Sequence, residues 1–393
     1  MLKLNILQAK FGDCMILEFG SEEQKPHYIL IDGGPDRTYE NYLYPNLESM
    51  RSGADGKKRL DIIIASHVDN DHVIGLIDFL ADLRRKREEE EENSTEGDKI
   101  ISVGSLWHNS FSDTIQLENI SSSSMAGDAV INIPSKLESL LERTKSFASN
   151  NNNLTATESA LMGIGEGRQL SLLAGILGIA INPGFPKGLI LAEEASNPVE
   201  IDNLNLRIIG PTKSNLEELR SEWLRWLEKY EAADISEPSI AAMADKSIPN
   251  LSSIVILAEA DGNNILFTGD ARGDHIIDGL RLAGLLDDDG HIHVDVLKVP
   301  HHGSDRNVTK TFFKTLTSDI YIISADGKYG NPDFSTLKWI IETAQERRSS
   351  IEIFLTNDTP VIRKVIQDYP PEQSGYHIVV MDKNASALDI KFE

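Results

Sequence analysis

The chain has 393 residues, enough for one large domain or two, and an apolar content of 40% that provides for a sizeable core. Its formal net charge of −24 argues against tight binding to duplex DNA, because such binding relies on basic patches that displace counterions. The single cysteine, Cys14, excludes an intramolecular disulfide and a four-cysteine zinc site, and it fits a reducing compartment.

Nothing in the sequence predicts a membrane span or a signal peptide. The longest apolar stretch, residues 170–181, is too short to cross a bilayer. Residues 1–6 interleave polar and apolar side chains, unlike the apolar core of a signal peptide. We therefore expect a soluble, cytoplasmic protein that does not bind membranes.

The first 34 residues predict a β-hairpin followed by a third strand. Residues 2–7 and 14–19 alternate as strands do, with a turn at residues 11–13 between them. The third strand, residues 28–31, is followed by Asp32 and two glycines that allow a sharp turn. Asp32 is either a turn-capping residue or a carboxylate that orients a metal-binding histidine.

The apolar strand predicted over residues 60–65 leads into a dense group of polar side chains. Residues 67–72 follow the pattern H-x-D-x-D-H, so two imidazoles and two carboxylates fall within six positions. Carboxylates packed together repel one another unless a cation compensates them. The pattern therefore predicts a divalent metal site, and the alternative is a solvated acidic turn. A helix predicted from Val73 onward would direct the positive end of its dipole at this loop.

The next predicted strand, residues 100–107, ends at His108. Chemistry is usually placed on loops held by a rigid scaffold, and the ends of these strands lead into such loops. His108 is therefore a candidate metal ligand.

Residues 112–250 differ from the rest of the chain in having low-complexity polar patches and helical patterns. An amphipathic helix is predicted over residues 216–230, and it carries Trp223 and Trp226 on one face. This arrangement is typical of core packing or of a surface for a protein partner. We predict that residues 112–200 form an inserted segment or lid and that residues 201–250 return to the core.

From residue 251 the strand pattern resumes, and two strands end in metal-competent residues. The strand over residues 265–268 runs into Asp270, and the strand over residues 294–299 runs into His301 and His302. Further strands are predicted over residues 204–209, 253–260, 320–324, 351–356 and 376–381.

Taken in order, these motifs resemble the metallo-β-lactamase superfamily. The resemblance rests on Asp32-Gly33-Gly34, the H-x-D-x-D-H loop, Gly269-Asp270 and His301-His302-Gly303-Ser304. The chain is most similar to the branch typified by the hydrolase domain of the competence protein ComEC, which it also resembles at Gly12-Asp13-Cys14, residues 298–304 and Tyr329-Gly330-Asn331-Pro332. The similar blocks lie within residues 1–80 and 251–340.

The resemblance implies an α/β fold (α+β by some schemes), the αβ/βα four-layer sandwich, with an inserted and mostly helical subdomain. Residues 1–111 would form the first half of this fold, residues 112–200 the insertion and residues 201–393 the second half.

The resemblance also implies two divalent metal ions, zinc or manganese. His67 and Asp69 would bind the first ion, with His108 as a candidate third ligand. Asp71, His72 and His301 would bind the second ion, and Asp270 would bridge the two. The commoner superfamily pattern has histidine at position 69, so aspartate there adds a hard oxygen ligand and shifts the preference toward Mn²⁺ or Mg²⁺.

The chemistry that the resemblance implies is hydrolysis by a hydroxide that bridges the two ions. Asp71 would also orient the nucleophile. His302 would donate a proton or contact phosphate, and the alternative for it is a supporting role behind a ligand. The candidate substrate contacts are Lys298, Ser304, Asn331 and Arg306.

Three functions follow, and the first is favoured. The first is a phosphodiesterase or nuclease acting on a phosphodiester or nucleotide-like substrate, where the negative charge favours a single strand or small molecule over a duplex. The second is a small-molecule hydrolase of a lactone, ester or β-lactam. The third is a component of a multi-protein system that binds a partner through residues 112–250 and keeps its metal site quiescent until assembly.

Overall fold

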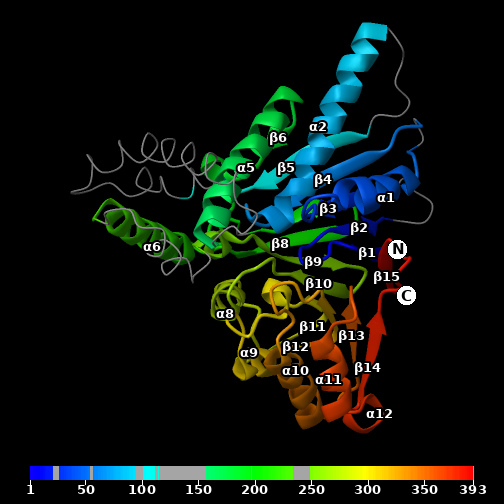
Figure 1. Ribbon diagram of the computed structural model, residues 1–393, viewed down its shortest axis with the longest axis vertical. Helices are drawn as coiled ribbons and strands as arrows, with labels where there is room; N and C mark the ends of the chain where they lie inside the picture. The colour runs from blue at the N-terminus through cyan, green and yellow to red at the C-terminus, as the bar shows by residue number, and fades with distance from the viewer. Residues whose placement is uncertain are drawn as a thin grey trace.

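In the computed structural model, the described residues are 1–20, 26–53, 56–93, 101–110, 114, 156–195, 197–232 and 248–392. They form two mixed β-sheets that pack face to face, with helices on the outer side of each sheet (Figure 1). The predicted α/β class and the pairing of two sheets are therefore confirmed.

The first sheet is built from the N-terminal half of the chain and closed by its C-terminal strand. Its neighbours are antiparallel from β15 to β3 and parallel from β3 to β6. In sheet order the strands are β15 (Ala387–Phe392), β1 (Leu2–Leu7), β2 (Met15–Phe19), β3 (His27–Ile31), β4 (Arg59–Ala65), β5 (Ser102–His108) and β6 (Ala180–Ile181).

The second sheet follows the same plan, with an antiparallel part and a parallel part. Its neighbours are antiparallel from β7 to β10 and parallel from β10 to β14. In sheet order the strands are β14 (Tyr376–Val380), β13 (Ile351–Leu355), β12 (Leu316–Ile323), β11 (Ile292–Lys298), β10 (Asn263–Phe267), β9 (Val255–Ala260), β8 (Leu204–Gly210) and β7 (Val199–Ile201).

Helices cover both outer faces. The first sheet carries α1 (Tyr44–Ser49), α2 (Asn70–Asn93) and α5 (Ala156–Ile176), and the second carries α8 (Gly273–Leu282), α9 (Lys310–Thr315), α10 (Phe334–Arg347), α11 (Pro360–Asp368) and α12 (Pro371–Ser374). The remaining helical segments are α6 (Lys213–Ala232), η1 (Tyr39–Leu43), η3 (Pro186–Gly188), η4 (Ile248–Ser252) and η5 (Pro300–Gly303).

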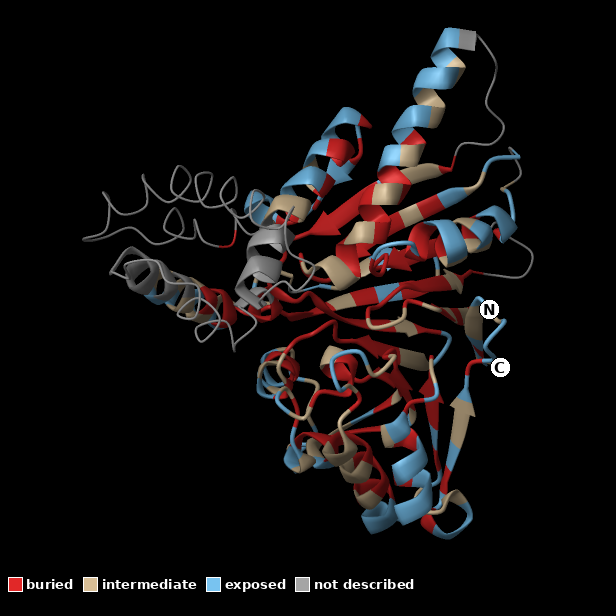
Figure 2. Cartoon of the chain, viewed as in Figure 1, coloured by how far each residue is buried: buried red, intermediate tan, exposed pale blue. Residues whose placement is uncertain are grey.

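Alternating strand patterns produce a core in three layers. Leu4, Ile29, Ile256 and Phe267 belong to the apolar layer between the two sheets. Two further apolar layers separate each sheet from its helices, so buried residues run through the middle of the molecule and exposed ones lie on the helices outside (Figure 2). Burial of this kind stabilises the fold by roughly 25 cal/mol per Å² of apolar surface removed from water.

The described part of the predicted insertion packs with the first sheet and its helices. Strand β6 pairs in parallel with β5, and α5 lies beside α2 (Figure 1). Leu170, Leu173 and Leu177 of this segment are buried in the same apolar layer as the first sheet. Residues 115–155 and the side chains of Trp223 and Trp226 lie outside the described residues, so the predicted partner surface is not described.

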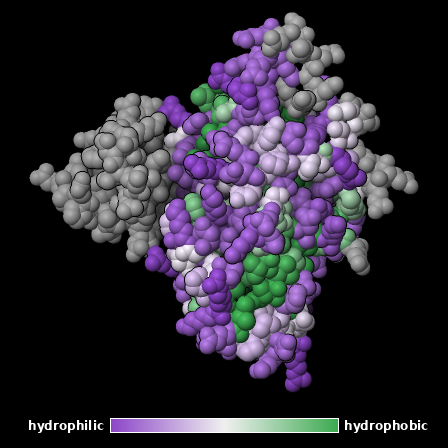
Figure 3. Space-filling view, turned by 45° about the vertical axis from the view of Figure 1, so that its right-hand side comes forward, coloured by the Kyte–Doolittle hydropathy of each residue, from purple (hydrophilic) through white to green (hydrophobic). Residues whose placement is uncertain are grey.

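The surface agrees with the composition. The face in Figure 3 is mainly hydrophilic, with one apolar area over the lower part of the view. Within the described residues, no helix is both long enough and apolar enough to cross a membrane.

Candidate metal centre

The H-x-D-x-D-H segment leaves β4 and turns directly into α2, which begins at Asn70, three residues earlier than the sequence predicts. The backbone N–H groups of His72 and Val73 donate to the Asp69 oxygen, at 2.9 and 3.1 Å. Asp71 therefore lies in the first helical turn, where the positive end of the helix dipole stabilises a carboxylate.

The turn at residues 11–13 packs closely on this segment. A Cβ atom at Gly12 would lie 1.9 Å from the backbone oxygen of Asp71, so only glycine permits this approach. The next residue, Asp13, donates its backbone N–H to the same oxygen at 3.3 Å and is fully buried. The hairpin turn thus brings a third aspartate to the segment.

Asp270 enters from the second sheet, just beyond the end of β10. Gly269 before it has a φ of +49°, and a Cβ atom there would lie 2.9 Å from Ser66. The backbone oxygen of Gly269 accepts a hydrogen bond from the His301 N–H at 3.2 Å. Asp270 is therefore held between the metal-binding loop of the first sheet and the histidine turn of the second.

The turn after β11 points two adjacent imidazoles at opposite oxygens of Asp270. His301, His302 and Gly303 all have left-handed backbone conformations, with φ of 48°, 55° and 83°. The His302 Nε2 lies 3.5 Å from Asp270 Oδ1, and the His301 Nε2 lies 3.6 Å from Asp270 Oδ2. The two oxygens of Asp270 accordingly divide the centre into two halves.

We call the Oδ1 side the inner half-site, formed by His72, His302, Asp71 and Asp270. The His72 Nε2 lies 3.4 Å from Asp270 Oδ1 and 3.3 Å from the His302 Nε2. The His302 Nε2 is also 3.4 Å from Asp71 Oδ2. His72, His302 and Asp270 lie close together with buried side chains, and the partly exposed Asp71 approaches them from one side.

We call the Oδ2 side the outer half-site, formed by His67, Asp69, His301 and Asp270. The His67 Nε2 lies 3.6 Å from Asp69 Oδ2 and 3.8 Å from Asp270 Oδ2. The side chains of Asp69 and His301 are 24% and 26% exposed, so this half-site opens to solvent.

Each inner imidazole is fixed by a hydrogen bond on its other nitrogen. The His72 Nδ1 lies 2.9 Å from Asp32 Oδ2, and the His302 Nδ1 donates to the Ser324 backbone oxygen at 2.9 Å. An Nδ1 that donates leaves Nε2 as the acceptor, which is the tautomer that binds metal. Of the two roles predicted for Asp32, the structure has the one that orients a histidine.

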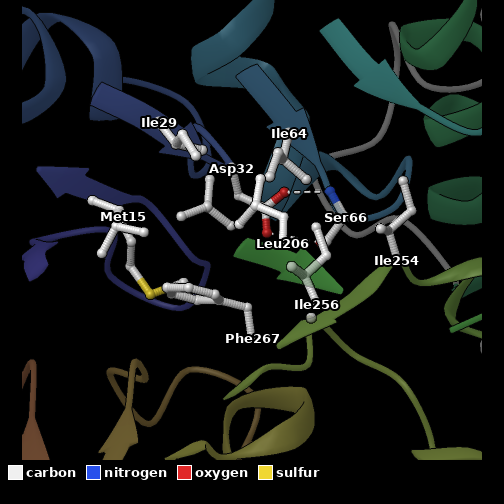
Figure 4. A pocket seen from close by; sticks show the side chains of 12 residues that line it. Met15, Ile29, Asp32, Ile64, Ser66, Leu206, Ile254, Ile256 and Phe267 are labelled. Atoms are coloured by element: carbon white, nitrogen blue, oxygen red, sulfur yellow. Dashed lines mark hydrogen bonds between the residues drawn. The ribbon is translucent and has the colours of Figure 1, made fainter. Parts of the chain in front are cut away.

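Asp32 lies at the edge of a small, enclosed cavity between the two sheets (Figure 4). Most of the lining is apolar, including Met15, Leu206 and Phe267. Asp32 accepts hydrogen bonds from the Ser66 N–H and hydroxyl, at 2.7 and 2.8 Å, and the first of these is drawn in Figure 4. The cavity is unsuited to a polar substrate, but its apolar walls strengthen the hydrogen bonds of Asp32.

Outer imidazoles have polar side chains as supports. The His67 Nδ1 lies 3.0 Å from the Ser66 hydroxyl, and the His301 Nδ1 lies 2.7 Å from Asn307 Oδ1. Ser66 therefore serves both halves, since the same hydroxyl bonds Asp32 behind the inner one.

Lys298 lies in the interior beneath the centre and cannot be the substrate contact that the sequence suggested. Its side chain is fully buried, and its Nζ lies 2.6 Å from Asp13 Oδ2. Burial alone would raise the pKa of Asp13, yet Lys298 and then His302 hold it well below its usual range. Lys298 compensates the charge of Asp13 behind His302, whose Nδ1 lies 3.6 Å from Asp13 Oδ1.

The charges of the inner half-site are strongly coupled. Burial disfavours a charge on His72, but Asp270, Asp32 and Asp71 raise its pKa well above the usual value. Burial likewise opposes charge on His302, and Asp270 and Asp13 raise its pKa. Asp270 resists protonation despite its burial, because the pKa of its carboxyl is lowered by His302, His301 and His72. A carboxylate excess of this kind attracts cations, whether protons or metal.

The residues fit a divalent metal ion. One atom each from Asp13, His72, Asp270 and His302 lies within 4.8 Å of the others, so this buried group could hold a metal ion. Asp13 is the least suited of the four, because Lys298 already compensates it. Among the described residues, three further buried atoms of the centre make no hydrogen bond: His67 Nε2, Asp69 Oδ1 and Asp270 Oδ1. Buried polar atoms without partners are costly, and a cation would satisfy them.

The structure brings seven of the predicted site residues together. Their assignment to the two half-sites differs from the prediction for His301 and His302. His302, predicted to donate a proton, lies in the inner half-site with Asp71 and His72. His301, predicted there, faces the outer half-site instead. The left-handed turn reverses the expectation that the first histidine after the strand points inward.

Three other predicted residues lie nearby with different contacts. His108 is buried at the end of β5, where its backbone exchanges hydrogen bonds with Asn182, and the metal-competent groups found among the described residues do not include it. Ser304 is buried and donates its N–H to the His301 oxygen at 2.9 Å. Asn331 Nδ2 donates to the same oxygen at 3.4 Å, so both residues support the histidine turn.

Asp13 and Glu166 were not among the residues predicted for the site. Asp13 belongs to the Gly12-Asp13-Cys14 motif, for which no role was predicted. Its place directly after a glycine was the available indication that it could lie in the site. Glu166 belongs to α5, in a stretch for which the sequence shows only a helical pattern.

No protein-family model matches this chain. The functional inference therefore rests on the geometry of the centre.

Proposed function

We propose that this protein is a metal-dependent hydrolase that cleaves phosphodiesters. The observation that carries the proposal is the geometry of Asp270, whose two oxygens each face two imidazoles from different turns. Such a pair of half-sites is suited to two divalent ions, with zinc or manganese as the candidates.

When bound, the ions would supply the Lewis acidity that activates water and neutralises charge on the attacked group. The chain's own residues would position them: Asp270 between the half-sites, and the imidazoles through their fixed Nδ1 atoms. Asp71 is half-buried on the solvent side of the inner half-site, where its second oxygen can orient a water molecule.

We further infer that the fold is the αβ/βα sandwich of the metallo-β-lactamase superfamily, in the branch that includes ComEC-like hydrolase domains. Two face-to-face mixed sheets with outer helices support this assignment. The convergence of H-x-D-x-D-H, Gly269-Asp270 and His301-His302 at one edge of the sheets supports it further.

An aromatic pair near the Gly12 turn, with Tyr329 exposed, favours a nucleotide-like phosphodiester over an ester. Phe11 and Tyr329 pack edge to face with ring centroids 5.3 Å apart, and Tyr329 is 68% exposed. The Nζ of Lys328 lies 3.7 Å from the Phe11 centroid. Phe11 adjoins Gly12, which touches Asp71, so bases could stack here while Lys328 meets a phosphate.

The test is metal-dependent turnover of a substrate panel. Purified protein with Mn²⁺ or Zn²⁺ should cleave bis-p-nitrophenyl phosphate and single-stranded oligonucleotides, and EDTA should abolish the activity. His72→Ala should lose it. His293→Ala is the matched control, because His293 is half-exposed and belongs to a separate group with Asp295 and Asp319.

Two results would contradict the proposal. Equal phosphodiester turnover by wild type and His72→Ala would show that the centre is not responsible. Turnover of lactones or p-nitrophenyl esters without phosphodiester cleavage would instead favour the small-molecule hydrolase.

A further inference from the structure

Helix α5 packs directly on the metal-binding loop. A Cβ atom at Gly167 would lie 2.7 Å from Val68 Cγ1 and 3.4 Å from His108 Cε1. Val68 stands between the first two predicted ligands of the loop, so the helix backbone touches the loop where the outer half-site is built. The glycine allows this contact because any side chain there would push the helix away.

The residue before this glycine, Glu166, places a carboxylate in the same region. Its Oε2 is buried and makes no hydrogen bond among the described residues. Burial, followed by the negative charges of Asp69 and Asp71, raises its pKa to about 8. Both of these aspartates belong to the H-x-D-x-D-H loop.

A cation would satisfy the Glu166 Oε2, which has no hydrogen-bond partner among the described residues and feels the charges of two aspartates. Among the described residues, no lysine or arginine forms an ion pair with Glu166. The fully buried His67 Nε2 also makes no hydrogen bond there. A carboxyl group with a raised pKa holds a proton near neutral pH, and a hard divalent ion that favours oxygen ligands would replace this proton on binding.

We propose that Glu166 is a ligand of the outer half-site, so that α5 supplies a carboxylate to the ion held by His67, Asp69 and Asp270. This inference rests on the proposed metal centre but not on any particular substrate. It gives the outer half-site three carboxylates beside its two imidazoles, whereas the inner half-site has two of each.

The difference in ligands predicts different metals. Oxygen ligands favour Mn²⁺ or Mg²⁺, and imidazole suits Zn²⁺. We therefore expect the inner half-site to retain Zn²⁺ and the outer half-site to take Mn²⁺, with Glu166 governing the second preference.

The test is a Mn²⁺ titration by calorimetry of metal-free protein and of protein loaded with one equivalent of Zn²⁺. Glu166→Gln removes the charge at nearly constant volume. We expect it to weaken the Mn²⁺ site by at least about tenfold, as loss of a supporting carboxylate commonly does, and to leave Zn²⁺ binding unchanged. Glu217→Gln is the matched control, because Glu217 is an exposed glutamate on α6.

A fold defect can be separated from a lost ligand. In EDTA, Glu166→Gln should have a Tm no lower than that of wild type, because the substitution removes a buried carboxylate that has no partner. If this variant is nevertheless unstable, Glu166→Asp, which retains the charge on a shorter side chain, should show weaker Mn²⁺ binding with a wild-type Tm.

The outcomes distinguish this inference from the proposed function. Wild type that binds no divalent ion would overturn both. Wild type that binds two ions, with Glu166→Gln binding them equally well, would overturn the role of Glu166 alone. Lost Mn²⁺ binding in the variant supports the role, whichever substrate the enzyme cleaves.

Discussion

The inner and outer half-sites share Asp270 but differ in how far their ligands are exposed to solvent. Both inner imidazoles are buried and are fixed from behind, His72 by Asp32 and His302 by the Ser324 backbone. In the outer half-site the His301 side chain is 26% exposed. The outer half-site is thus the more open of the two, and an ion bound there would be within reach of a substrate.

The comparison suggests different roles for the two half-sites. The preorganised inner half-site would hold an ion tightly because its ligands need little rearrangement. A more open outer half-site exchanges water and substrate oxygens readily. The following predictions test this contrast, beginning with the residue common to both halves.

Asp270→Asn should have the largest effect. It removes the negative charge between the half-sites, so both ions should be lost and activity should fall by at least ~100-fold, beyond the 10–100-fold typical of outer supporting residues. Metal content by mass spectrometry, together with phosphodiester turnover, measures both. A variant that keeps two ions and wild-type turnover would show that the halves are not joined through Asp270.

Lys298→Met should destabilise the fold from beneath the inner half-site. Asp13 would be left as a buried, unpaired charge, at a cost of about 3–5 kcal/mol in the free energy of unfolding. Urea unfolding of the metal-free protein measures this cost. The control is Lys314→Met, which breaks an exposed pair with Glu346 and should cost less than about 1 kcal/mol. Equal costs would mean that Asp13 is not charged in the folded protein.

Substitutions of the adjacent histidines should separate the halves. His302→Ala should release the inner ion and abolish activity. His301→Ala should retain the inner ion and reduce activity about tenfold, since a water molecule can take the exposed position. Metal equivalents per chain and kcat report the difference. The reverse ranking would indicate that His301 is the inner ligand, as the sequence suggested.

The dependence of Tm on pH should be confined to the metal-free state. The pKa values of His72 and His302 are raised by the surrounding carboxylates, so the stability they add is fully present below the unfolded pKa of about 6.5. It is lost as the pH rises through the raised folded pKa values. In EDTA the Tm should therefore decrease above neutral pH, whereas metal affinity should increase and binding should release protons. A Tm without this dependence would contradict it.

Tyr329→Ala should have the smallest effect and should concern substrate alone. Loss of one stacking surface should raise KM for an oligonucleotide about tenfold, given ~1–3 kcal/mol per stacked base. The KM for bis-p-nitrophenyl phosphate and the metal content should not change. The control is Tyr42→Phe, a conservative change on η1.

Much of the fold could be predicted because its strands are short apolar runs that end in polar residues. The strand predicted over residues 2–7 agrees with β1, and the predicted helix over 216–230 lies within α6. Strand β15 escaped prediction because its residues 387–392 contain two charged positions and its partner, β1, is at the other end of the chain. Pairing over that distance leaves no local signal.

The candidate centre was predictable as a set of residues but not as an arrangement. Periodicity and spacing show that His301 and His302 follow a strand, but only the left-handed backbone decides which imidazole faces which oxygen. Lys298 has a charged side chain and was expected to contact a substrate phosphate, and its partner Asp13 lies far away in the sequence. Glu166 has no motif at all, because its place depends on how α5 packs on the loop.

The left-handed turn at residues 301–303 has one more consequence. His301 and His302 occupy a conformation that costs roughly 1–2 kcal/mol for each non-glycine residue. A Cβ atom at Gly303 would lie 2.8 Å from Pro332, so packing confines the turn from the other side. The two imidazoles are carried by the same short, constrained backbone segment. The backbone of this turn therefore sets the spacing between the two half-sites before any ion binds.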